Sequence, residues 1–252
     1  MAKMTLDDLS ARLSQAHGDQ LTAVVLYGSA AGGEHHADRS DHNVLVIVRT
    51  LVPATLRATA AATHAWQAAG NPPPLILTEA EWRSSRDVFA IEYVDILERH
   101  RVLTGALPEG PRKVDPAHLR HQLEFEAMGK LLRLRRGILA CNGDVKEELT
   151  LLAASKSAVL VLFRTLVRVH GESAPASSEA VVRRAAALAG FDPAPFIEVV
   201  AHEAGRGTIP PERVDDVLTA YHAGIERFVA HVDQLVHSST VPGRRRRHSS
   251  SC

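Results

Sequence analysis

Cysteine is almost missing from this chain: its 252 residues include only Cys141 and Cys252. Two cysteines cannot build a disulfide framework, and neither of them sits in a pair spaced to hold zinc. This scarcity fits a reducing compartment, so we expect a cytoplasmic protein.

An excess of one charge is also missing, because 29 Lys and Arg residues balance 29 Asp and Glu residues. The chain therefore lacks the general basic surplus that would indicate a nucleic-acid partner, and we do not favour such a partner. The basic run Arg244–Arg247 lies in residues 238–252, which have too little apolar content to fold and are expected to form a disordered, solvated tail.

Long apolar runs are a third absence. The N-terminus, MAKMTLDDLS, lacks the apolar core of a signal peptide. We find no apolar run of the length that crosses a bilayer, and so we expect no membrane association.

The sequence does contain two contrasting parts, joined by a Pro- and Gly-rich linker. Residues 1–107 mix strand and helix patterns, and residues 112–237 show a helical pattern almost throughout. We expect an α/β (α+β) fold: a small domain with a mixed sheet, followed by an all-helical bundle domain. Strands are expected over 21–27, 43–48, 75–77 and 88–97; helices over 6–17, 53–69, 78–85, 118–141, 145–169, 177–189, 195–204 and 211–236.

The informative segment joins the first two strands. The apolar run LTAVVLY ends in Gly28-Ser29, and the next apolar run, NVLVIV, is preceded by Asp41. Glycine lets a backbone approach a phosphate closely, and turn N–H groups with the Ser hydroxyl donate to phosphate oxygens. A carboxylate opening the next strand is suited to Mg²⁺, so Gly28, Ser29 and Asp41 predict a nucleotide site.

These residues resemble the nucleotidyltransferase superfamily, which includes polymerase β-like enzymes, aminoglycoside nucleotidyltransferases and small bacterial MNT proteins. LYGSAAGGE is similar to its first element and SDHNVLVIV to its second, and the likeness covers residues 20–100. The resemblance implies binding of an NTP such as ATP with Mg²⁺. It also implies transfer of a nucleoside monophosphate to a hydroxyl acceptor, here an unknown small molecule or protein.

Two positions depart from the family pattern. Asn43 stands where a second carboxylate is usual, and Gly32 stands where an arginine is frequent. An amide oxygen still ligates Mg²⁺ but lacks the charge that holds two metal ions close together. The alternative is therefore a degenerate member that binds nucleotide or a partner for regulation.

A third carboxylate is expected on the strand predicted over residues 88–97. Residues three apart on a strand face opposite sides, so only one of Glu92 and Asp95 would face the site. We prefer Asp95, as a metal ligand or proton acceptor, with Glu92 as second choice. An ion pair with Arg99 or Arg101 is the non-functional alternative for either.

The helical part offers one competing pattern. Arg164 and His170 in RTLVRVH resemble the loose Arg-His signature of HEPN domains, some of which cleave RNA. A general acid-base histidine beside a phosphate-binding arginine would supply that chemistry. We rank this third, after nucleotidyl transfer and degenerate nucleotide binding; the sequence does not indicate the oligomeric state.

Overall fold

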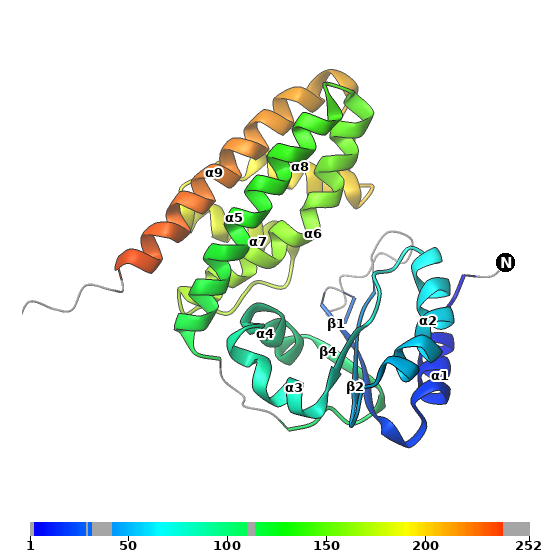
Figure 1. The fold of residues 1–252 in the computed structure, drawn as a ribbon. Coiled ribbons are helices and arrows are strands. Elements are labelled where there is room, and N and C mark those ends of the chain that lie inside the picture. The colour runs from blue at the N-terminus through cyan, green and yellow to red at the C-terminus, as the bar shows by residue number, and fades with distance from the viewer. Residues whose placement is uncertain (1–2, 29, 32–41, 110–113, 239–252) are drawn as a thin grey trace, which may run out of the picture.

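The computed structural model describes residues 3–28, 30–31, 42–109 and 114–238. Four strands form one mixed sheet in the order β3-β2-β1-β4, as Figure 1 shows. Their bounds are β1 Leu21–Tyr27, β2 Asn43–Val48, β3 Leu75–Thr78 and β4 His100–Gly105. The central strand β1 runs antiparallel to β2 and β4, whereas β3 runs parallel to β2. The predicted mixed sheet followed by helices is confirmed.

Alternating side chains of the central strands give the sheet two apolar faces. One face packs against α1 (Leu6–His17) and α2 (Pro53–Ala68), and the other packs against α3 (Glu79–Ser84) and α4 (Ala90–Glu98). Val24 and Val46 point to the first layer, and Val25 and Leu45 to the second. This period of two explains why β1 and β2 were recognisable as buried strands.

Capping chemistry sets several helix ends. Thr5 begins α1 with a capping box to Asp8, and Thr78 begins α3 in the same way with Glu81. Short 3₁₀ turns follow at Gly18–Gln20, Ser85–Asp87 and Pro211–Arg213. The predicted starts of both helices are therefore confirmed within one residue.

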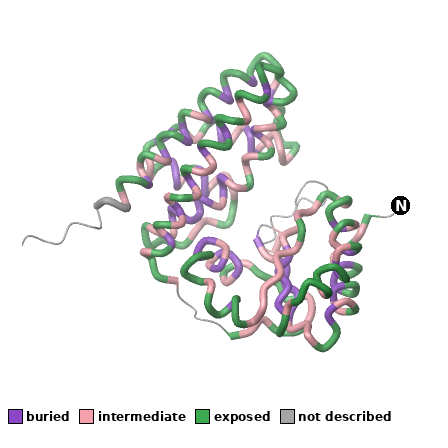
Figure 2. Tube along the Cα trace, in the orientation of Figure 1, coloured by how far each residue is buried: buried purple, intermediate pink, exposed green. Residues whose placement is uncertain are grey.

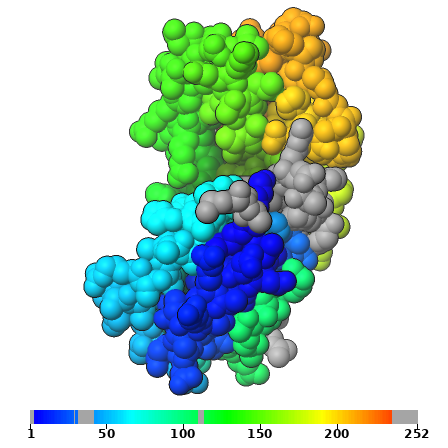
Figure 3. All heavy atoms as spheres, turned by 90° about the vertical axis from the view of Figure 1, so that its right-hand side faces the viewer, coloured from blue at the N-terminus to red at the C-terminus, as the bar shows by residue number. Residues whose placement is uncertain are grey.

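Five helices form the C-terminal part and enclose a core of their own. Their bounds are α5 Pro116–Cys141, α6 Val145–Val169, α7 Ser178–Ala189, α8 Ala194–Glu203 and α9 Val214–Ser238. Phe163 on α6 lies at the centre, with its ring 5.0 to 5.2 Å from those of Phe191, Phe196 and Phe228. The buried residues in Figure 2 line the inward faces of these helices. In the space-filling view of Figure 3 the helical part and the α/β part form two stacked lobes.

The prediction of a strand over residues 88–97 is wrong, because this segment forms α4. Its Tyr93 and Ile96 pack under the sheet, while Ala90 and Ile91 join the core of the helical part. A helix presents these two pairs in different directions and so joins both cores. The fourth strand is instead β4, an edge strand whose side chains are mostly exposed.

The expectation about apolar length also needs correction. The helix α6 is long and apolar enough, by composition, to cross a membrane, but half of that apolar window is buried inside the protein. Burial among α5, α7 and α9 explains why the central helix of the bundle is so apolar.

Candidate functional site

The site begins where the central strands end. Tyr27 pairs with Asn43 of β2 on one side and with His100 of β4 on the other. The end of β1 and the starts of β2 and β4 therefore lie side by side next to Gly28. The Gly28 N–H donates to the Arg99 carbonyl at 3.1 Å, and its own carbonyl accepts from the Ala31 N–H at 3.2 Å. Gly28 has φ of +79°, a conformation that favours glycine.

Two polar side chains from different elements converge on Gly28. A Cβ atom at this position would lie 3.4 Å from Asn43 Nδ2 and 3.8 Å from Asp95 Oδ2. Asn43 opens β2 and Asp95 lies on α4, so the fold brings together residues 52 positions apart in sequence (95 − 43). The absence of a side chain at Gly28 keeps this space open.

A histidine fixes the start of β2. The His42 N–H donates to Asn71 Oδ1 at 3.0 Å, and the ring Nδ1 lies 3.2 Å from the same oxygen. The ring also packs 5.9 Å from Trp66 of α2. These contacts hold the backbone directly before Asn43, so the orientation of that amide depends on the α2 layer.

Asp95 is a buried carboxylate held by two arginines. Arg99 Nη2 lies 2.5 Å and Arg168 Nη2 lies 3.1 Å from Oδ1, and Arg168 also binds Glu98 at 2.6 Å. Burial raises the pKa of Asp95, but the charges and hydrogen bonds of Arg99 and Arg168 outweigh it and hold this pKa below its usual range. Because both arginines bind Oδ1, the other oxygen is the one that faces Gly28.

Glu92 lies one turn before Asp95 on the same helix. Gln122 of α5 donates its Nε2 to Glu92 Oε2 at 2.9 Å, and its Oε1 accepts the Ile91 N–H at 2.9 Å. Burial raises the pKa of the Tyr27 phenol to about 12, and the charges of Glu92 and Asp95 add to that shift. Residues three apart on a helix share a face, so both carboxylates reach the site, which corrects the expectation that only one would.

A cavity of about 1070 Å³ opens from this point between the α/β part and the helical part. Tyr27, Gly28 and Asn43 line it from the strand ends, and Glu92 and Asp95 line it from α4. The rest of the described lining comes mainly from α5, α6 and the ends of α7 and α8. Sites for drug-sized molecules occupy roughly 300 to 1,000 Å³, so this cavity has room for a nucleotide and a second molecule.

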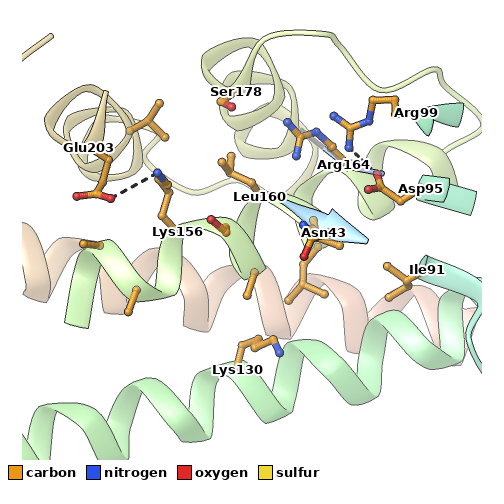
Figure 4. A pocket seen from close by; sticks show the side chains of 18 of the residues that line it. Asn43, Ile91, Asp95, Arg99, Lys130, Lys156, Leu160, Arg164, Ser178 and Glu203 are labelled. Atoms are coloured by element: carbon orange, nitrogen blue, oxygen red, sulfur yellow. Dashed lines mark hydrogen bonds and ion pairs between the residues drawn. The ribbon is translucent and has the colours of Figure 1, made fainter. Parts of the chain in front are cut away.

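Charges of both signs line the cavity. The described lining has five basic and five acidic side chains: Arg99, Lys130, Lys156, Arg164 and Arg206, and Glu92, Asp95, Glu126, Glu179 and Glu203. Figure 4 places the Lys156–Glu203 pair, 3.6 Å apart, at one end and Arg99, Asp95 and Arg164 at the other. Arg164 is a buried arginine at the end nearest the Gly28 turn, a placement suited to a phosphate group.

Several predicted residues can now be placed. Gly28, Asn43, Glu92 and Asp95 come together, whereas Ser29 and Asp41 lie outside the described residues. Of the HEPN-like pair, Arg164 faces the cavity. His170 is exposed, and its Nε2 lies 3.4 Å from Nε2 of His231 on α9.

The arginines that hold Asp95 include one that sequence reasoning missed. Arg99 is an ion-pair partner expected from the sequence, and the structure confirms its pairing with Asp95. Arg168 had not been named. Arg164 and Arg168 stand four residues apart in the mostly apolar end of α6, residues 158–169. This spacing puts two charges that are costly to bury on one face and was the available signal.

The described donors do not by themselves fit Mg²⁺. Oxygen ligands at Gly28 come from the Asn43 amide and from Asp95, whose charge two guanidinium groups already balance. Within residues 3–28, 30–31, 42–109 and 114–238, no three His, Cys, Asp or Glu side chains form a group that could hold a metal ion.

No family model matches this chain, and no curated protein matches it significantly. Among solved structures, it is similar to a spectinomycin adenyltransferase from Enterococcus faecialis determined with ATP and spectinomycin. The match covers 91% of this chain and 95% of that chain, at 11% identity and a TM-score of 0.49. That likeness is loose.

Proposed function

We propose that this chain is a nucleotidyltransferase-like protein that binds a nucleoside triphosphate in the cavity and transfers its nucleoside monophosphate to a hydroxyl acceptor. The observation that carries the proposal is the meeting of Gly28, Asn43 and Asp95 at the mouth of a large cavity. In this arrangement a glycine turn, open to close backbone approach, faces polar side chains from the next strand and from α4.

The phosphates would lie between the Gly28 turn and the basic side chains of Arg99 and Arg164. Arginine presents several N–H donors in a plane and binds phosphate oxygens in pairs. On binding, Arg99 would give up part of its ion pair with Asp95 and contact the phosphates instead. The longer end of the cavity, toward Lys156, would then be left for the acceptor.

The acceptor oxygen would form a bond to the α-phosphorus as the bond from that phosphorus to the α,β-bridging oxygen breaks and pyrophosphate leaves. The acceptor hydroxyl must lose its proton in this step. The Glu92 carboxylate accepts a hydrogen bond from the neutral amide of Gln122. The Asp95 carboxylate is instead paired with the guanidinium groups of Arg99 and Arg168. Glu92 is therefore the better proton acceptor, and Asp95 is better suited to hold a hydroxyl in place through Oδ2. This assignment reverses the order preferred from the sequence.

A second candidate function is nucleotide binding without turnover. Two observations favour it: the amide of Asn43 beside Gly28, and the balance of the Asp95 charge by Arg99 and Arg168. Both lower the negative charge at the turn. A domain of this kind would sense a nucleotide rather than consume it.

Pyrophosphate formation from ATP, with and without Mg²⁺ and with mixed hydroxyl acceptors, separates the two candidates. Turnover by the wild type supports transfer, whereas turnover gained only in Asn43→Asp supports the binding protein. Asn142→Asp is a matched control, because Asn142 ends α5 in a loop outside the described cavity lining. If neither wild type nor Asn43→Asp binds nucleotide, both candidates are wrong.

A further inference from the structure

Two histidines meet where the end of α6 lies against α9. His170 is the C-cap residue of α6 and His231 lies on α9, and their Nε2 atoms are 3.4 Å apart. The ring centroids are 5.6 Å apart, and the ring planes differ by only 16°. Because the two nitrogens lie closer together than the ring centres, the rings turn their Nε2 edges toward each other rather than stacking face to face.

The separation of the two nitrogens fits a shared metal ion better than a hydrogen bond. A hydrogen bond from an N–H group usually spans about 2.7 to 3.2 Å, which is shorter than this contact. Two imidazole nitrogens that each lie about 2.0 to 2.1 Å from one tetrahedral zinc ion are roughly 3.3 to 3.4 Å apart. An ion held by both rings therefore needs only small side-chain rotations, with α6 and α9 left in place.

The surroundings of this histidine pair also suit a cation. His170 lies at the C-terminus of the 25-residue helix α6, where the helix dipole places partial negative charge. Burial and the charge of His170 lower the pKa of His231, which favours the neutral ring that a metal ion needs. The His170 side chain is exposed, so an ion reaches the pair from solvent.

We propose that His170 and His231 bind a divalent transition-metal ion such as Zn²⁺ through their Nε2 atoms, and that this ion ties the end of α6 to α9. Imidazole nitrogens are suited to Zn²⁺, Ni²⁺ and Cu²⁺. Neither histidine belongs to the described lining of the cavity, so this site is independent of the proposed nucleotide binding.

The two imidazoles are the protein ligands, and water completes the coordination. The pKa of Glu172 is lowered first by its hydrogen bond to Arg184 and in part by the charge of His170, so this carboxylate lies near the pair. Both of its oxygens bind Arg184, which keeps it from the metal. No three His, Cys, Asp or Glu side chains gather as ligands in the part of the chain that the structure describes. A site with open, water-filled positions binds an exchangeable ion.

Thermal unfolding of the full chain without an affinity tag, in ZnCl₂ and in EDTA, tests the site. We expect Zn²⁺ at about a hundred times its dissociation constant to raise Tm by about 5 °C or more, because an ion that binds only the folded chain stabilises it. His170→Asn and His231→Asn should each remove most of this rise, since each deletes one of two protein ligands and keeps a polar side chain. His64→Asn is the matched control, because His64 is an exposed histidine on α2, in the other lobe.

Competition with a chromophoric zinc chelator measures the binding itself. We expect the tightest Zn²⁺ to bind at one ion per chain in the wild type and in His64→Asn, and at least about tenfold more weakly in His170→Asn and in His231→Asn. Circular dichroism in EDTA should be the same for all variants, because both histidines are at least partly exposed. A wild type whose Tm does not respond to Zn²⁺ would show that the pair is a hydrogen-bonded contact only and overturns the proposal. A response that survives in the double variant, or that is lost equally in His64→Asn, places the ion elsewhere and overturns it too.

Discussion

At the scale of single residues, the site depends on what Gly28 lacks. Its φ of +79° disfavours any side chain, and a Cβ atom added there would lie only 3.4 Å from Asn43 Nδ2. The sequence pattern indicated Gly28 at the end of the first strand, and the resemblance to the nucleotidyltransferase superfamily singled out Asn43 at the start of the next. It could not predict Arg168 as the second partner of Asp95, because a contact between residues 95 and 168 depends on how the helical part docks.

Gly28→Ala should weaken nucleotide binding and lower the free energy of unfolding by about 1 to 2 kcal/mol, the cost of placing an L side chain in this conformation. Gly70→Ala is the control: its φ is +95°, yet a Cβ there meets nothing within 4 Å. Urea unfolding and an ATP titration on both variants make the comparison. Equal nucleotide affinity in the two variants would show that Gly28 does not touch the ligand.

Asp95→Asn should cost about 3 kcal/mol of unfolding free energy at neutral pH, because it leaves two arginines without their shared buried carboxylate. The pKa of Asp95 is lowered in the folded state, so its stabilisation is present above the unfolded pKa. It is lost as the pH falls through the folded pKa. Wild type and Asp95→Asn should therefore converge in stability in acid.

Urea unfolding across this acid range measures the convergence. Glu172→Gln is a control, since the Glu172–Arg184 pair is exposed and should matter far less. A difference between wild type and Asp95→Asn that stays constant with pH would contradict the ionised pairing of Asp95.

At the scale of elements, the two central strands and most helices could be predicted, and the region from Val88 to Gly105 could not. VFAIEYVDIL is rich in strand-forming residues, but its acids at 92 and 95, with Glu98 directly after it, are spaced three apart, which is a helical spacing. Tertiary packing against both cores settles the helix. HRVLTG has no apolar run because an edge strand leaves most of its side chains exposed.

The packing of α9 against α8 gives an element-scale prediction. A Cβ at Gly224 would lie 2.5 Å from Phe196 Cε2, and that ring is wedged between Phe163, Phe191 and Tyr221. Gly224→Ala should therefore cost about 1 to 3 kcal/mol from overpacking.

Gly137→Ala on α5 is the matched comparison for Gly224→Ala. A methyl group there would press only on the end of the Leu151 side chain, which can rotate. Its cost should be offset by the roughly 1 kcal/mol that alanine gains over glycine in a helix. Thermal unfolding of both variants gives the ranking, and a larger loss in Gly137→Ala would contradict this account of the bundle core.

At the scale of the whole molecule, two lobes with separate cores meet at α4 and enclose the cavity between them. A ligand that touches both lobes stabilises the folded chain by mass action, by about 2.7 kcal/mol at a hundred times its dissociation constant. Most of the residues that line the cavity could not be predicted from sequence, because they are drawn from both lobes. The strand ends that form the mouth of the cavity could be predicted.

We propose that the Gly28 turn and this cavity bind a nucleotide. A fluorescence titration of labelled ATP, with and without Mg²⁺, tests it most directly on wild type, Asp41→Ala and Gly28→Ala, with unlabelled ATP as competitor. We expect saturable, competed binding by the wild type that is weakened at least about tenfold in both variants, the loss of one or more strong phosphate contacts. A wild type that binds no nucleotide under either condition, or variants that bind as tightly as the wild type, would contradict the account.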